Sequence, residues 1–130
     1  MRHRKILIID DEPDITEEMV ELLSDHGLHA TVVNNAEEGR QTALLDSEIS
    51  VVITDVRMPG LDGYGLIRQM KHELVRKGRS PQFIVVTGHA GMEEEMEARR
   101  LGVFAFIPKP VQPRDLLRVT RAALEQNKNR

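Results

Sequence analysis

The sequence predicts an α/β fold in which a parallel five-stranded sheet is covered by helices on both faces. Two observations support this class. Five short apolar runs alternate along the chain with five longer segments whose apolar residues recur at helical spacing. Three of the runs are almost continuously apolar, which is typical of strands buried on both faces, as in parallel sheets.

The predicted strands are short, and four of the five are rich in Val and Ile. They span residues 5–9, 28–33, 51–54, 82–86 and 105–107. Strands that alternate with helices form βαβ units with right-handed crossovers. Five such units are expected to give a three-layer sandwich with the flavodoxin-like strand order 2-1-3-4-5, although periodicity alone does not specify that order.

The predicted helices carry recognisable start and stop signals. Pro13 stands near the first helical position and Gly27 beyond the last turn of the first helix, while Asn35 and Asp62 can cap the second and third. The helices span residues 13–26, 36–46, 63–74, 91–101 and 112–126. The fourth has an acidic first turn but a thin apolar stripe, which is typical of a low-stability element. The basic connection over residues 75–81 is expected to be exposed.

Composition limits the class of function. The chain has 130 residues, enough for one domain with its own core. Because it has no cysteine, we expect neither disulfides nor thiolate metal sites. It has no apolar stretch of membrane-spanning length, which favours a cytoplasmic protein. A net charge of −3 and only three Phe, one Tyr and no Trp argue against a dedicated nucleic-acid binder.

Polar side chains stand at the carboxyl ends of four predicted strands. They are Asp10, Asp11, Glu12, Asp55, Thr87 and Lys109. In the expected order the first and third strands are neighbours, so carboxylates from both gather at one edge of the sheet. Two such charges ~4 Å apart repel by roughly 4 kcal/mol at an effective dielectric of ~20, so a cation or a raised pKa is needed.

The oxygen-only ligands at this edge favour Mg²⁺. By itself, the tripeptide at residues 10–12 is more simply explained as a helix cap before Pro13; its conjunction with Asp55 favours a metal site. Asp55 can act as a nucleophile that forms an acyl phosphate. Lys109 and Thr87 can each bind a phosphoryl oxygen. Taken singly, Lys109 is more simply explained as a solvated loop lysine and Thr87 as a capping threonine.

Four segments of the chain together resemble the receiver domain of bacterial two-component response regulators. They are Ile-Ile-Asp10-Asp11-Glu12-Pro13, Asp55-Val-Arg-Met-Pro59-Gly-Leu-Asp62-Gly63, Val86-Thr87-Gly88 and Phe106-Ile-Pro-Lys109-Pro110. The resemblance covers essentially the whole chain. It predicts a receiver domain over residues 1–130, with a core at about 4–126 and no output domain. A stand-alone regulator and a receiver cut from a longer protein both remain open.

The resemblance implies a role for each residue of the edge. Asp55 would accept a phosphoryl group from a phosphohistidine on a histidine kinase or phosphotransfer protein. Asp10, Asp11, Asp55 and the backbone carbonyl of Arg57 would arrange the Mg²⁺ shell, and Lys109 and Thr87 would bind the phosphoryl oxygens. Glu12 becomes a supporting acid, and the Lys109–Pro110 bond is expected to be cis. The chain would catalyse only its own phosphorylation and dephosphorylation, not turnover of a substrate.

The resemblance also implies a switch. Thr87 would move toward the new charge and Phe106 would rotate inward, although Phe106 equally fits a strand residue at the edge of the core. Gly88 would leave room above the phosphoryl group. Arg57 and His89 would tune its lifetime, or are exposed loop residues. The surface over residues 91–101, 105–107 and 112–126 would contact a downstream protein or an absent output domain, or form a dimer.

Two other functions compete with this one. A phosphatase of the haloacid-dehalogenase kind also uses Asp, Thr, Lys and Mg²⁺, but it places Asp-x-Asp after the first strand, and here Asp10 and Asp11 are adjacent. A phosphorylation-independent module of the same fold usually lacks the acceptor, threonine or lysine, and all three are present. The basic last helix lacks a recognition motif for nucleic acid, so a solvated or protein-docking face is the better interpretation.

Overall fold

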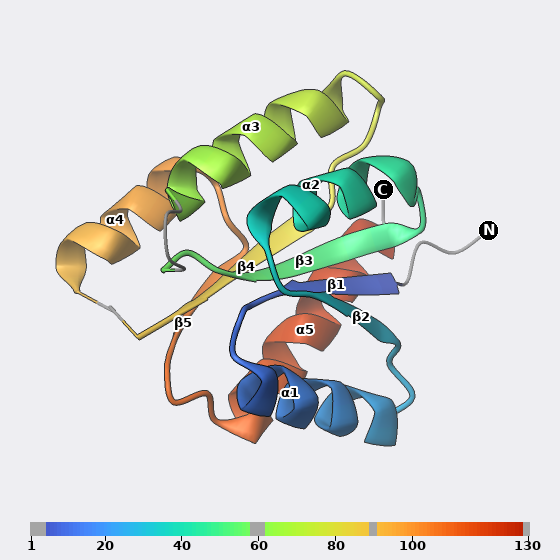
Figure 1. Cartoon of the computed structure of the whole chain (residues 1–130), viewed down its shortest axis with the longest axis vertical. Helices are drawn as coiled ribbons and strands as arrows, with labels where there is room; N and C mark the ends of the chain where they lie inside the picture. The colour runs from blue at the N-terminus through green and yellow to red at the C-terminus, as the bar shows by residue number, and fades with distance from the viewer. Residues whose placement is uncertain (1–4, 58–61, 89–90, 129–130) are drawn as a thin grey trace.

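The computed structural model describes residues 5–57, 62–88 and 91–128, and it contains the predicted three-layer α/β sandwich (Figure 1). Its five strands are parallel and follow the order β2-β1-β3-β4-β5, as expected. The strands are β1 (Lys5–Ile9), β2 (Ala30–Val33), β3 (Ile49–Asp55), β4 (Gln82–Thr87) and β5 (Ala105–Pro108). The helices are α1 (Pro13–Asp25), α2 (Ala36–Leu45), α3 (Gly63–Val75), α4 (Met92–Arg100) and α5 (Pro113–Lys128).

Alternate residues of each strand belong to two separate cores. In β1, Ile6 and Ile8 pack with residues of α1 and α5, whereas Leu7 and Ile9 pack with residues of α2 and α3. All four side chains are fully buried. Figure 1 shows α1 and α5 on one side of the sheet and α2 and α3 on the other. Burial on both faces explains why the sequence shows continuous apolar runs instead of alternation.

The second strand begins at Ala30, two residues later than predicted. Gly27, with a φ of +75°, reverses the chain after α1, and the N–H of Leu28 then donates to the Leu23 carbonyl at 2.8 Å. This is the hydrogen-bond pattern of a Schellman cap, in which the residue after the glycine closes the helix. Because Leu28 caps α1 and packs into its core, it is not available to the strand ladder.

The connection between α3 and β4, residues 75–81, is expected to be exposed, and most of it is. Arg79 and Pro81 are the exceptions. The guanidinium of Arg79 is half-buried and donates to the backbone carbonyls of Ala43 at 2.6 Å and Asp46 at 2.9 Å, with longer contacts to Leu44 and Ile49. These carbonyls lie at the end of α2 and the start of β3. Arg79 therefore satisfies acceptors that the end of a helix leaves without intrahelical partners.

Replacing Arg79 by methionine is expected to lower the free energy of unfolding by about 2 kcal/mol, because hydrogen bonds from a charged donor are lost and their acceptors stay partly buried. Urea unfolding followed by circular dichroism would measure the change. Arg76→Met alters an exposed neighbour of the same type and should change stability by less than about 0.5 kcal/mol. Equal effects of the two substitutions would contradict the role of Arg79.

In the part of the chain that the structure describes, we find no helix with the length and apolar character needed to cross a membrane.

Candidate functional site

The carboxyl ends of β1 and β3 bring three aspartates together. Ile9 is paired with Thr54, so Asp10 and Asp55, which follow them, lie side by side at the edge of the sheet. Asp10 is 2 % exposed and Asp55 4 % exposed. Together with the exposed Asp11 they offer carboxylate oxygens that all lie within 4.8 Å of one another.

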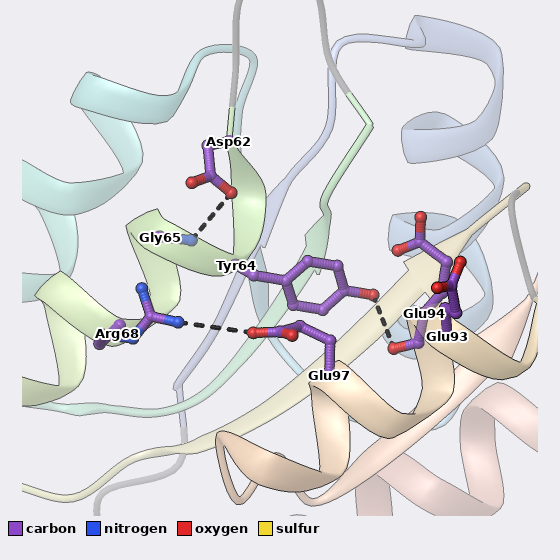
Figure 2. A pocket seen from close by; sticks show the side chains of 7 residues that line it. All are labelled: Asp62, Tyr64, Gly65, Arg68, Glu93, Glu94 and Glu97. Carbon is purple, nitrogen blue, oxygen red and sulfur yellow. Dashed lines mark hydrogen bonds and ion pairs between the residues drawn. The ribbon is translucent and has the colours of Figure 1, made fainter.

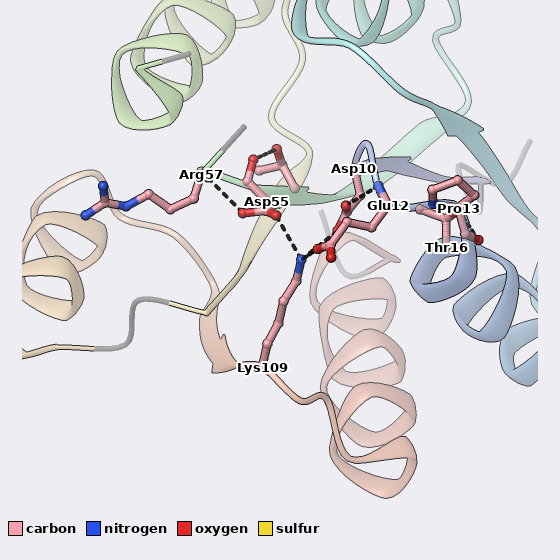
Figure 3. A network of polar contacts seen from close by, with 8 residues as sticks. Asp10, Glu12, Pro13, Thr16, Asp55, Arg57 and Lys109 are labelled. Carbon is pink, nitrogen blue, oxygen red and sulfur yellow. Dashed lines mark hydrogen bonds and ion pairs between the residues drawn. The ribbon is translucent and has the colours of Figure 1, made fainter. Parts of the chain in front are cut away.

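Lys109 places its ammonium among these acids (Figure 3). Its Nζ lies 2.8 Å from Asp55 Oδ2, 2.6 Å from Glu12 Oε1 and 3.2 Å from Asp10 Oδ2. The lysine side chain is only 12 % exposed. Its backbone N–H donates to the Thr87 carbonyl at 2.8 Å, so the chain after β5 is held against the end of β4. The predicted cis bond between Lys109 and Pro110 is confirmed.

Hydrogen bonds also fix the orientation of the two buried carboxylates. Asp55 Oδ1 accepts from the backbone N–H of Arg57 at 2.8 Å. Asp10 Oδ1 accepts from the N–H of Glu12 at 3.0 Å, which closes a tight turn before α1. Asp10 Oδ2 has its ion pair with Lys109 but no hydrogen bond among the described residues. One buried oxygen can therefore still accept a further ligand.

The surroundings of the site shift the pKa values of Asp10 and Lys109. Burial raises the pKa of Asp10, and the N–H of Glu12 and the charge of Lys109 offset only part of this effect. Burial alone would lower the pKa of Lys109, but its hydrogen bonds to Asp55 and Glu12 outweigh burial and raise that pKa. The lysine therefore stays charged at neutral pH, and the buried carboxylate of Asp10 gains from a cation.

The donor set fits a hard divalent cation. All the candidate ligands are carboxylate oxygens, one of them buried and without a hydrogen bond, and they converge from β1 and β3. Mg²⁺ is bound by one or two carboxylates together with water and phosphate oxygens, which matches this acidic pocket. The residues that would hold it are Asp10, Asp11 and Asp55. The role of the Arg57 carbonyl stays a prediction.

The residues expected to form the switch lie around this pocket. Thr87 is the fully buried last residue of β4, opposite Pro108 of β5. Gly88 has open space: apart from its own atoms and those of its chain neighbours, no described atom lies within 4 Å of the position that a Cβ would take. Phe106 is half-buried and packs against the core under α2 and α3, as a residue at the core edge would. His89 lies outside the described residues, so its role stays a prediction.

Two contacts of the site could not be predicted from the sequence. Glu12, expected as a supporting acid, makes the shortest of the three contacts of Lys109. The Arg57 side chain turns away from Asp55 and pairs with Glu94 on α4, instead of covering the pocket (Figure 3). Nothing in the local sequence identifies Glu94, because it follows Arg57 by 37 positions.

The fold and this site together define an α/β protein with an acidic pocket at the carboxyl edge of its parallel sheet, and the pocket could bind a cation. A family model described as the response regulator receiver domain matches residues 6–121. The chain belongs to this family. The resemblance that its motifs suggest is therefore confirmed, and receiver domains of this family are signalling switches.

Curated relatives carry the same domain within proteins of different length. The two-component response regulator PprB of Pseudomonas aeruginosa is 38 % identical over 116 residues, which are 89 % of this chain and 42 % of PprB. An uncharacterized 14.6 kDa protein of Leptolyngbya boryana is 34 % identical over 89 % of this chain and 86 % of its own length. The chain thus spans less than half of PprB.

Solved structures show the same fold over nearly the whole chain. A receiver domain protein from Methanospirillum hungatei has a TM-score of 0.83 at 28 % identity and covers 97 % of both chains. A receiver domain protein from Clostridium thermocellum has a TM-score of 0.84 at 31 % identity, over 95 % of this chain and 96 % of that one. The fold and the family therefore agree.

Mg²⁺ is expected to stabilise the folded chain by relieving repulsion among the carboxylates. At about ten times its dissociation constant it should add ~1.4 kcal/mol to the free energy of unfolding, since it binds the native state. For a chain of this size that corresponds to a rise in Tm of ~3–6 °C, measured by thermal unfolding with and without Mg²⁺.

Asp11→Asn should reduce this rise, because it removes one of the candidate ligands. Asp14→Asn, which alters an exposed acid in the first turn of α1, is the matched control and should keep the full rise. A Tm that does not respond to millimolar Mg²⁺ would contradict the metal site.

Proposed function

We propose that the chain is a phosphoacceptor switch in which Asp55 receives a phosphoryl group from a phosphohistidine on a histidine kinase or phosphotransfer protein. The observation that carries this proposal is the buried Asp55 carboxylate with Lys109 Nζ 2.8 Å from its Oδ2. A carboxylate held beside a fixed cation is prepared for a reaction that brings more negative charge to the same place.

The reaction joins one carboxylate oxygen of Asp55 to the phosphorus. The bond between phosphorus and the imidazole nitrogen of the donor breaks, and the released imidazole keeps the electron pair and takes up a proton. Lys109 stabilises the phosphoryl oxygens by charge, and Thr87 offers its hydroxyl. Mg²⁺ held by Asp10, Asp11, Asp55 and the Arg57 carbonyl would neutralise charge on the incoming group.

The output of this switch is a changed surface, not a released product. Thr87 and Phe106 would adjust to the phosphoryl group, and the surface of α4, β5 and α5 would present the change to a downstream protein or an output domain. The same surface is the one through which two copies would pair. In this proposal the receiver domain occupies residues 1–130, with its core at about 4–126, and acts in the cytoplasm.

The phosphoacceptor role is tested by incubating the protein with Mg²⁺ and a small phosphodonor and measuring intact mass. We expect one added phosphoryl group on the wild type and none on Asp55→Asn, because the amide is not a nucleophile here. Asp115→Asn, which alters a half-exposed aspartate in the first turn of α5, is the control and should be phosphorylated like the wild type. An undiminished adduct on Asp55→Asn would refute the assignment, and continuous release of phosphate from a small ester would favour a phosphatase.

Lys109→Ala is expected to slow phosphorylation about a hundredfold, the usual effect of losing one group that stabilises developing charge. Initial rates of adduct formation would measure the loss. Lys109→Arg keeps the charge but has a planar, forked head, so it should recover only part of the rate. A wild-type rate for Lys109→Ala would show that the ammonium is structural and takes no part in the transfer.

A further inference from the structure

Helix α4 is attached to the rest of the molecule mainly by polar contacts. Of its nine residues, all of them described, only Ala98 is buried. Its two large apolar side chains, Met92 and Met96, are exposed. Helices α1, α3 and α5 each bury a wider apolar face, so α4 depends more than they do on hydrogen bonds and ion pairs.

These polar contacts come from one face of α3, formed by residues at i, i+4 and i+7. Figure 2 shows the first two, Tyr64 and Arg68, pointing toward α4. Tyr64 Oη donates to the Glu94 carbonyl at 3.2 Å, and Arg68 Nη2 lies 3.4 Å from Glu97 Oε2. Lys71 Nζ donates to the Leu101 carbonyl just past the end of α4, at 2.6 Å. Burial and the contact with Glu94 raise the pKa of Tyr64, so its hydroxyl stays protonated and remains a donor.

A fourth contact comes from the two described residues that follow the predicted acceptor Asp55, Val56 and Arg57, here called the acceptor loop. The Arg57 guanidinium pairs with the Glu94 carboxylate in the first turn of α4, while the Arg57 backbone N–H donates to Asp55 Oδ1. Arg57 is 50 % exposed and Glu94 17 %. Figure 3 shows the guanidinium on the opposite side of Asp55 from Lys109. One residue thus touches both the predicted acceptor and the helix beyond it.

The charge balance around Arg57 changes when Asp55 is modified. A phosphoryl group carries about −1.5 to −2 charges and three acceptor oxygens, whereas Glu94 offers a single negative charge. Guanidinium groups bind phosphoryl oxygens in a bidentate way, and an exposed ion pair such as that with Glu94 is weak. Lys109 already lies among the carboxylates on the other side, so the arginine and the lysine would approach a phosphoryl group on Asp55 from different directions.

We propose that Arg57 exchanges partners on phosphorylation: it leaves Glu94 for the phosphoryl group on Asp55, and the first turn of α4 is released. This inference rests on the proposed function. Loss of Arg57 also leaves Glu94 without its cation in a groove of about 310 Å³ between α3 and α4, which Asp62, Glu93 and Glu97 already make acidic. The released turn is then further destabilised by repulsion between like charges.

Hydrogen–deuterium exchange of α4 tests the exchange of partners in the whole protein, with intact mass recorded on the same samples. In the wild type, phosphorylation should make the α4 amides exchange about two- to fivefold faster, the factor expected for losing an ion pair of this exposure. Glu94→Gln should exchange faster before phosphorylation, and the modification should then add little.

Arg68→Gln is the matched control, because it breaks the neighbouring ion pair to Glu97 without touching the acceptor loop. It should speed exchange in both states and keep the effect of phosphorylation. If Glu94→Gln keeps the full effect, or exchanges at the wild-type rate when unmodified, the proposal is wrong. An adduct without any change in α4 would overturn this inference alone, whereas absence of the adduct would overturn the proposed function and the inference with it.

Discussion

The acidic edge of the sheet depends on the ammonium of Lys109. It lies within 3.2 Å of carboxylates from Asp10, Glu12 and Asp55, two of which are nearly inaccessible to water. Removing charges from water is costly unless they are paired, so the burial of these acids is tolerable because the cation is buried with them. The backbone N–H of Lys109 donates to the carbonyl of Thr87, so the position of the lysine is fixed by the end of strand β4. The group that permits the pocket to fold is the same group that the proposed chemistry uses.

The sequence was sufficient for features that follow from periodicity and topology. Continuous apolar runs identify buried strands, and parallel strands end at one edge, so the meeting of Asp10 with Asp55 and Lys109 could be predicted without coordinates. Features that depend on a distant backbone group could not. Arg79 binds carbonyls more than thirty positions away, and no side-chain pattern identifies a carbonyl acceptor. The late start of β2 belongs to this group as well. The backbone N–H of Leu28 bonds to the Leu23 carbonyl at the end of α1 and not to a neighbouring strand, and an apolar side chain is compatible with either arrangement.

Both faces of the sheet carry an apolar core, but one helix is attached to the molecule by different forces from the others. Helices α1 and α5 are fixed by apolar burial, which contributes about 25 cal/mol per Å² and is indifferent to nearby charge. Helix α4 is attached through charged and polar groups from α3 and the acceptor loop, and such contacts respond to any new charge and to salt. The part of the molecule whose attachment responds to charge therefore lies next to the predicted acceptor.

The strand order also bears on how the chain is made. The pairing of β1 with β3 places Asp10 beside Asp55. Lys109, which neutralises them, follows β5, the last strand. Chains emerge from synthesis N-terminus first. The two carboxylates are thus complete, and able to meet, before their internal cation exists. Until β5 joins the sheet, the repulsion between them has to be relieved by cations from solution or by a proton, so we expect closure of the central strands to depend on the ions and the pH around the nascent chain.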